Sequence, residues 1–154
     1  MLSIHSTSID LESVPTEIMI QAFADRILVL VTQMGKVGNL IQASIPSTTP
    51  LLSSDDLDED GDSQTAGLPA PPAAIQLTPL LGGASSEHLQ TLHSLYAAQI
   101  ATIIWVEEAK RSMGVNRRSV VVGIALQKSR DADDERKIFL GVMDHLYRLV
   151  NQAG

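Results

Sequence analysis

The alternation of apolar and polar residues predicts several strands in the first third of the chain. Residues 16–23 alternate between two faces, which is typical of a strand, and a weaker strand near residues 8–12 precedes them. Residues 26–33 contain the run ILVLV, which is apolar on both faces and indicates a central strand with cover on each side. Residues 39–44 alternate again, so we expect a hairpin between them and 26–33, joined by a short glycine-rich turn.

The second half of the chain predicts two helices and two further strands. Residues 75–81 read as a strand, which Pro79 restricts to an edge or a strand end. A helix capped by Ser85 or Ser86 is expected to run to about Met113, with its apolar stripe at Leu89, Leu92, Tyr96, Ile100 and Ile103. Residues 119–126 (SVVVGIAL) form a second strand that is apolar on both faces, and acidic residues from Asp131 open a final helix that ends near Val150.

These elements predict an α+β domain with a largely antiparallel sheet of six strands and two main helices, in the order βββββαβα. With 154 residues, of which 44% are hydrophobic, the chain is long enough for one compact domain, which we place at residues 8–150. Residues 45–74 hold five prolines and an acidic run, and we expect a mobile loop inside that domain.

The two strands that are apolar on both faces raise the question of what covers them. Burying a Val, Leu or Ile side chain stabilises the fold by roughly 1.5 to 3 kcal/mol. A strand with one apolar face exposed to water would lose several such contributions. Either the two helices lie on opposite faces of the sheet or a partner subunit covers the second face. We favour the partner, and so a dimerising domain.

Charge and composition narrow the classes of partner. The net charge is −7, but six acidic residues lie between Asp55 and Asp62, and the remaining 12 acidic residues nearly balance the 11 basic ones. A nearly neutral body argues against nucleic-acid binding, which needs a basic face. The absence of cysteine suits a reducing compartment, the cytoplasm or the nucleus, and neither a signal peptide nor a membrane span is apparent.

The Gly35–Lys36 pair does not fit a phosphate-binding loop. Such a loop needs a glycine five positions before the pair and a Ser or Thr after the lysine, where this chain has Leu30 and Val37. We therefore interpret residues 33–38 as a hairpin tip, in which Gly35 and Gly38 would relieve positive-φ strain.

No other group of residues predicts chemistry. His88 and His93 lie five positions apart on the expected helix, roughly 140° around its axis, and do not converge on one metal ion. The acidic run 55–62 lacks the Glu that a calcium loop requires. We expect no enzyme activity, no cofactor and no metal site.

Basic residues gather around the connection between the long helix and the strand that follows it: Lys110, Arg111, Arg117 and Arg118. Four cations at one corner could bind an acidic surface of a partner. Together with Lys36 and Val37 at the expected hairpin tip, they are our candidate partner-binding residues.

The sequence from Val14 to Ser44 resembles the N-terminal half of the proteasome assembly chaperone 3 family. The resemblance lies in Val14-Pro15-Thr16, in Phe23, and in the stretch ILVLVTQMGKVG from Ile27 to Gly38. It implies a non-enzymatic chaperone that forms a dimer with itself or with the related assembly chaperone 4. The pair would bind proteasome α subunits and promote assembly of the α-ring of the core particle. The residues leave open an alternative, a small α+β adaptor that recruits protein partners in trafficking or signalling.

Overall fold

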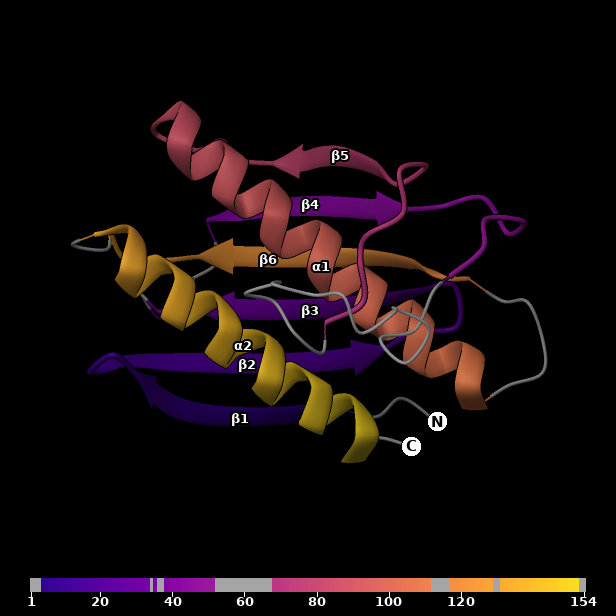
Figure 1. Cartoon of the computed structure of the whole chain (residues 1–154), viewed down its shortest axis with the longest axis horizontal. Coiled ribbons are helices and arrows are strands. Elements are labelled where there is room, and N and C mark those ends of the chain that lie inside the picture. The colour runs from indigo at the N-terminus through magenta and orange to yellow at the C-terminus, as the bar shows by residue number, and fades with distance from the viewer. Residues whose placement is uncertain are drawn as a thin grey trace, which may run out of the picture.

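The computed structural model describes residues 4–33, 35, 38–51, 68–111, 117–128 and 131–152, which form one six-stranded sheet and two helices (Figure 1). The predicted order βββββαβα and the largely antiparallel sheet are confirmed. The elements are β1 (Ile4–Leu11), β2 (Val14–Ala22), β3 (Arg26–Thr32), β4 (Asn39–Ser44), β5 (Gln76–Leu81), α1 (Glu87–Arg111), β6 (Ser119–Ala125) and α2 (Ala132–Gln152).

The strand order in space is β1-β2-β3-β6-β4-β5, and it corrects the predicted hairpin. β3 and β4 do not pair with each other, because β6 lies between them, parallel to β3 and antiparallel to β4. All six residues 120–125 of β6 are buried, so this strand gains most from the centre of the sheet. β3 and β4 are therefore not the two strands of a hairpin.

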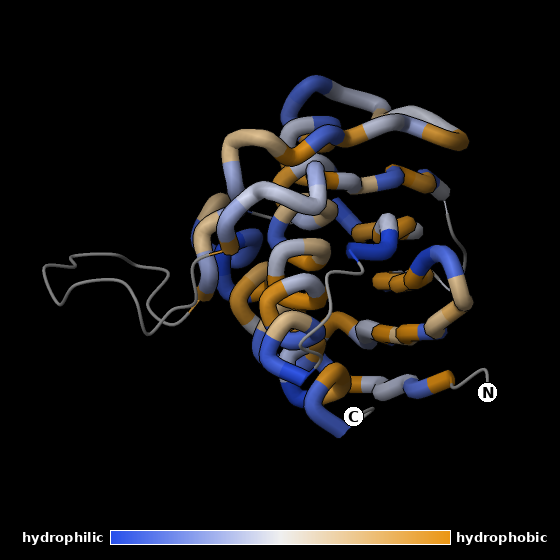
Figure 2. The backbone as a smooth tube through the Cα atoms, turned by 90° about the vertical axis from the view of Figure 1, so that its right-hand side faces the viewer, coloured by the Kyte–Doolittle hydropathy of each residue, from blue (hydrophilic) through white to orange (hydrophobic). Residues whose placement is uncertain are grey.

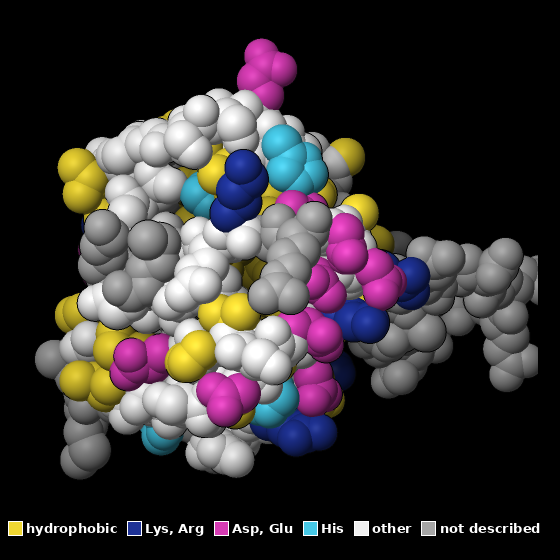
Figure 3. Space-filling view, turned by 90° about the vertical axis from the view of Figure 1, so that its left-hand side faces the viewer, with side chains coloured by type: hydrophobic (Ala, Val, Ile, Leu, Met, Phe, Trp, Pro, Cys, Tyr) yellow, Lys and Arg dark blue, Asp and Glu magenta, His cyan; other side chains and the backbone are white. Residues whose placement is uncertain are grey.

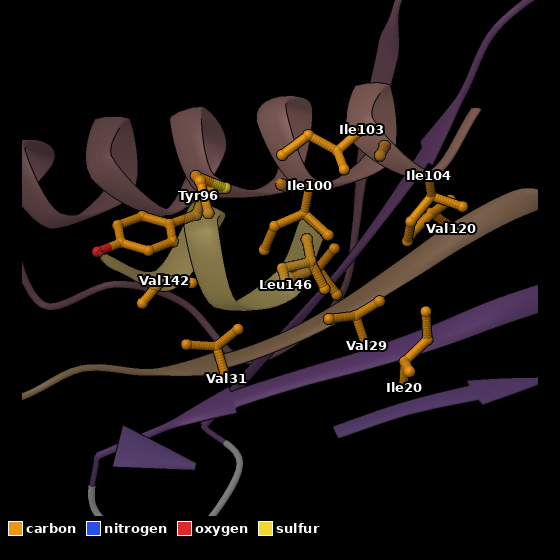
Figure 4. Close-up of a cluster of buried hydrophobic side chains, with 14 of the residues drawn as sticks. Ile20, Val29, Val31, Tyr96, Ile100, Ile103, Ile104, Val120, Val142 and Leu146 are labelled. Atoms are coloured by element: carbon orange, nitrogen blue, oxygen red, sulfur yellow. The ribbon is translucent and has the colours of Figure 1, made fainter. Parts of the chain in front are cut away.

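Both helices lie on the same face of the sheet, so the helices do not divide between the two faces (Figures 1 and 2). Between them and the sheet lies the core, in which inward side chains of β2, β3 and β6 meet those of α1 and α2 (Figure 4). The Tyr96 and Phe139 rings join the two helices edge to face, with centroids 5.0 Å apart.

Side-chain oxygens cap the first turns of both helices, at Ser86 as predicted and at Asp131, which was predicted only as an acidic first-turn residue. The Ser86 Oγ accepts a hydrogen bond from the Leu89 amide at 3.2 Å, and the Asp131 carboxylate accepts one from the Asp134 amide at 2.8 Å. Neither helix among the described residues combines the length and the apolar character that crossing a bilayer requires.

Both ends of the interval 45–74 pack against the domain. Leu51 and Leu68 contact the core, and the buried Gln99 side chain donates a hydrogen bond to the Pro69 carbonyl at 2.8 Å. The acidic run 55–62 lies outside the described residues, so its predicted mobility stays a prediction.

Candidate protein-interaction surfaces

The face of the sheet opposite the helices is not covered by any described helix or strand (Figure 2). Along each strand, alternation sends every second side chain to this face. Ile18 and Ile20 are buried toward the helices, so Met19 between them points outward, and Leu28 and Leu30 point outward for the same reason. We call this surface the open face.

The strand register aligns apolar residues across the middle of the open face. Met19 pairs with Leu30, Leu30 with Gly123, Gly123 with Leu40, and Leu40 with Leu81. The row thus crosses five strands, and Leu81 at its end is 62% exposed. We call it the central row: Met19, Leu30, Gly123, Leu40 and Leu81.

Polar residues flank the apolar part of the open face. Glu17 and Thr32 pair with each other on one side of the central row. Beyond Leu28 and Val121 on the other side, Arg26 pairs with Ser119. An apolar centre with a polar perimeter is the usual anatomy of a protein–protein interface.

The whole open face, with its polar perimeter, is close to the lower size limit of a biological interface. Six strands about 4.8 Å apart and about seven residues long give a face of roughly 24 by 23 Å. That is on the order of 550 Å² for each partner, or about 1,100 Å² for a pair, just above the roughly 1,000 Å² expected of a biological interface.

Gln33, which lies in the stretch ILVLVTQMGKVG, has a structural role in the fold. Gln33 is 6% exposed, and its amide nitrogen donates to the Thr16 hydroxyl of β2 at 3.1 Å. Its side-chain oxygen accepts from the Gln127 amide at 3.0 Å, just after β6. One side chain thus joins the ends of β2, β3 and β6, which sequence reasoning missed because the partners are 17 and 94 positions away.

The glycines of the same segment differ in their conformation. Gly35 has a φ of +70°, as predicted, whereas Gly38 is not among the residues with positive φ, so that part of the prediction is wrong. The second such glycine is Gly82, which follows β5. Lys36 and Val37 lie outside the described residues, and their contact with a partner stays a prediction.

The basic residues do meet at one end of the sheet, but each also contacts its own chain. The Arg118 guanidinium donates to the Phe23 carbonyl at 2.6 Å and pairs with Glu108. Lys110 Nζ lies 3.3 Å from Glu107 Oε1, and Arg117 donates to the Pro46 carbonyl at 2.9 Å. These cations therefore form contacts within their own chain, and their binding to a partner stays a prediction.

Arg111 supplies positive charge to the end of the other helix. Its guanidinium donates to the Val150 carbonyl at 2.6 Å and to Asn151 Oδ1 at 3.3 Å. α2 has no basic residue in its own last turn, so Arg111 complements the negative end of that helix dipole.

The histidines have separate partners, as their spacing predicted. His93 Nδ1 lies 3.1 Å from Asn39 Nδ2, and His88 Nε2 lies 2.8 Å from Glu135 Oε1. Burial lowers the pKa of His93, which favours the neutral ring that can accept from the Asn39 amide. The described residues contain no group of three or more His, Asp or Glu side chains that could hold a metal ion.

A hollow of about 360 Å³ lies at the end of β1, β2 and β3, lined by Asp10, Glu17 and the Thr32 and Gln33 segment. Figure 3 looks onto this end of the molecule, where many Asp and Glu side chains reach the surface. The described lining of the hollow contains two carboxylates, Asp10 and Glu17, and no histidine, lysine or arginine.

Comparison with known proteins gives a weak likeness in shape. The fold resembles a chain from the crystal structure of a novel chaperone complex for yeast 20S proteasome assembly, with a TM-score of 0.47 and 14% sequence identity over 94% of this chain and 98% of that chain. No family model matches the sequence, and no curated protein matches it.

Proposed function

We propose that this chain is a non-enzymatic assembly chaperone whose open face packs against the sheet of a related chaperone subunit. The pair would bind proteasome α subunits in the cytoplasm or nucleus and promote assembly of the α-ring of the 20S core particle. The observation that carries the proposal is the central row on a sheet face that no described element covers.

Water reaches the apolar side chains of the open face in the single chain. Met19, Leu30 and Leu40 are only partly buried in the single chain. Completing the burial of such a side chain contributes up to roughly 1.5 to 3 kcal/mol. A second sheet face, packed about 10 Å away as in a β-sandwich, would remove these side chains from water and leave the polar perimeter exposed.

The choice of partner rests on the sequence resemblance carried by residues 14–44. It points to a related chaperone as the second sheet and to α subunits as the cargo. A preformed pair that holds α subunits side by side raises their effective concentration, which speeds ring closure without any chemical step.

The first test measures mass in solution, for the chain alone and mixed with a chaperone 4-like subunit. We expect a dimer in at least one case, and Leu30→Glu should weaken it at least a hundredfold by placing a charge in the centre of the interface. Gln90→Glu is the matched control, because Gln90 is exposed on α1, which lies on the opposite side of the sheet from the open face. A monomer in both mixtures, or equal effects of the two variants, would contradict the proposed interface.

The second test identifies the cargo. Tagged wild-type chain isolated from its own cells should retain α subunits, identified by mass spectrometry, and Leu30→Glu should lose the partner chaperone. Recovery of unrelated proteins through the segment 47–73, with no α subunit, would instead support the adaptor alternative.

A further inference from the structure

A small cavity lies at the basic end of the molecule, between the sheet and the last turns of both helices. Its floor is aliphatic and comes from three parts of the fold: Ile20 and Ile27 of the sheet, Ile104 of α1 and Val150 of α2. These four side chains are between 1% and 7% exposed. The rim is charged and includes Arg111, Arg118 and Glu108.

The volume of the cavity limits what can enter it. It measures about 130 Å³, whereas sites for cofactors and drug-sized ligands occupy about 300 to 1,000 Å³. An apolar cavity of about 150 Å³ holds a molecule the size of benzene. The cavity therefore has room for about one branched aliphatic side chain.

The charges at the rim favour an anion beside that side chain. Glu108 already pairs with Arg118, which leaves Arg111 with no carboxylate partner among the described residues. Both hydrogen bonds of Arg111 come from the same terminal nitrogen, Nη2. Its Nε and Nη1 have no hydrogen-bond partner among the described residues, and each can donate a single charge-assisted hydrogen bond to a carboxylate oxygen.

We propose that this cavity binds the C-terminal residue of a partner chain that ends in Leu, Ile or Val. The terminal carboxylate would accept hydrogen bonds from Arg111, with Arg118 adding positive charge, and the aliphatic side chain would rest on the floor.

A chain end fits better than an internal acidic residue. In a C-terminal Leu the carboxylate and the aliphatic side chain are attached to the same Cα, so the side chain can fill the cavity while the carboxylate stays at the charged rim. An Asp or Glu side chain brings the carboxylate alone and would leave the aliphatic floor without a partner. The site lies on the helix side of the sheet, so a partner on the open face would not block it.

The test is a titration of the ¹⁵N-labelled full chain with the peptide Gly-Ser-Gly-Ser-Gly-Leu, followed by NMR. We expect shifts at the Arg111 and Arg118 Nε–H signals and at residues lining the cavity. The same peptide with an amidated C-terminus should bind at least tenfold more weakly, since it lacks the charge.

Two variants separate the charge from the floor. Arg111→Gln should weaken binding at least fivefold, while Arg117→Gln should not, because Arg117 contacts Pro46 and does not line the cavity. Ala22→Leu should block binding by filling the cavity with both arginines intact. Melting temperatures establish that each variant is folded.

Three results would overturn the proposal: equal binding of acid and amide, wild-type binding by Ala22→Leu, or no shift at 5 mM peptide. None of them bears on dimerisation through the open face, which the Leu30→Glu variant tests separately.

Discussion

Gly82, just after β5, lies directly against Asn39 at the start of β4. A Cβ atom on residue 82 would lie 2.5 Å from Asn39 Oδ1 and 2.2 Å from the Gly38 carbonyl oxygen. Gly82 also has a φ of +77°, where other residues are strained. The glycine therefore allows the chain to pass close to Asn39, whose amide contacts His93 of α1.

Gly82→Ala should destabilise the fold by about 2 to 4 kcal/mol, since it combines backbone strain with a clash against backbone atoms. Urea unfolding measures the change. Gly83→Ala is the matched control, because a Cβ there meets nothing within 4 Å, and its effect should stay below about 1 kcal/mol. Equal effects of the two variants would show that the close approach to Asn39 does not exist.

Gln33→Ala should lower the free energy of unfolding by about 2 to 3 kcal/mol. The change removes the bonds to Thr16 and Gln127 and leaves buried polar groups without partners. Gln42→Ala, on β4 and facing away from the core, is the control and should change the stability by less than about 0.5 kcal/mol. If Gln33→Ala changed the free energy of unfolding as little as the control does, the structural role of Gln33 would be contradicted.

The lowered pKa of His93 predicts a loss of stability in mild acid. Burial lowers this pKa from the ordinary value of 6.5, so the unfolded chain binds the proton at a higher pH than the folded chain does. The free energy of unfolding should therefore fall as the pH drops through 6.5 toward the folded pKa. Chemical unfolding at pH 7.5, 6.5 and 5.5 measures the slope.

The two histidines of α1 provide the comparison. His93→Gln should flatten the pH slope, while His88→Gln should keep it, because the His88 side chain is 69% exposed. The same slope in both variants would mean that other groups control the acid sensitivity.

The proposed dimer should depend little on salt. Apolar side chains dominate the central row, so raising NaCl from 50 to 500 mM should change the dissociation constant by less than about threefold. Sedimentation velocity over a range of concentrations measures it. A loss of affinity of tenfold or more would instead indicate association through the basic residues at the end of α1.

Much of the local structure follows from the sequence because its causes are local. Alternation of side chains identified β2, the apolar run ILVLV identified β3, and Ser86 caps α1 as its position predicted. The runs around Leu28 and Val121 also predicted that both faces of these strands would be apolar.

Only the tertiary structure decided which strands are neighbours and which face of the sheet the helices cover. The short segment between β3 and β4 favoured a hairpin, but inserting β6 buries more apolar surface, and that gain depends on residues 77 to 93 positions away. For the same reason, only the fold shows that both helices cover one face and that Arg111 caps α2. Periodicity assigns each residue to a side of its own strand or helix, whereas pairing and packing depend on contacts between distant parts of the chain.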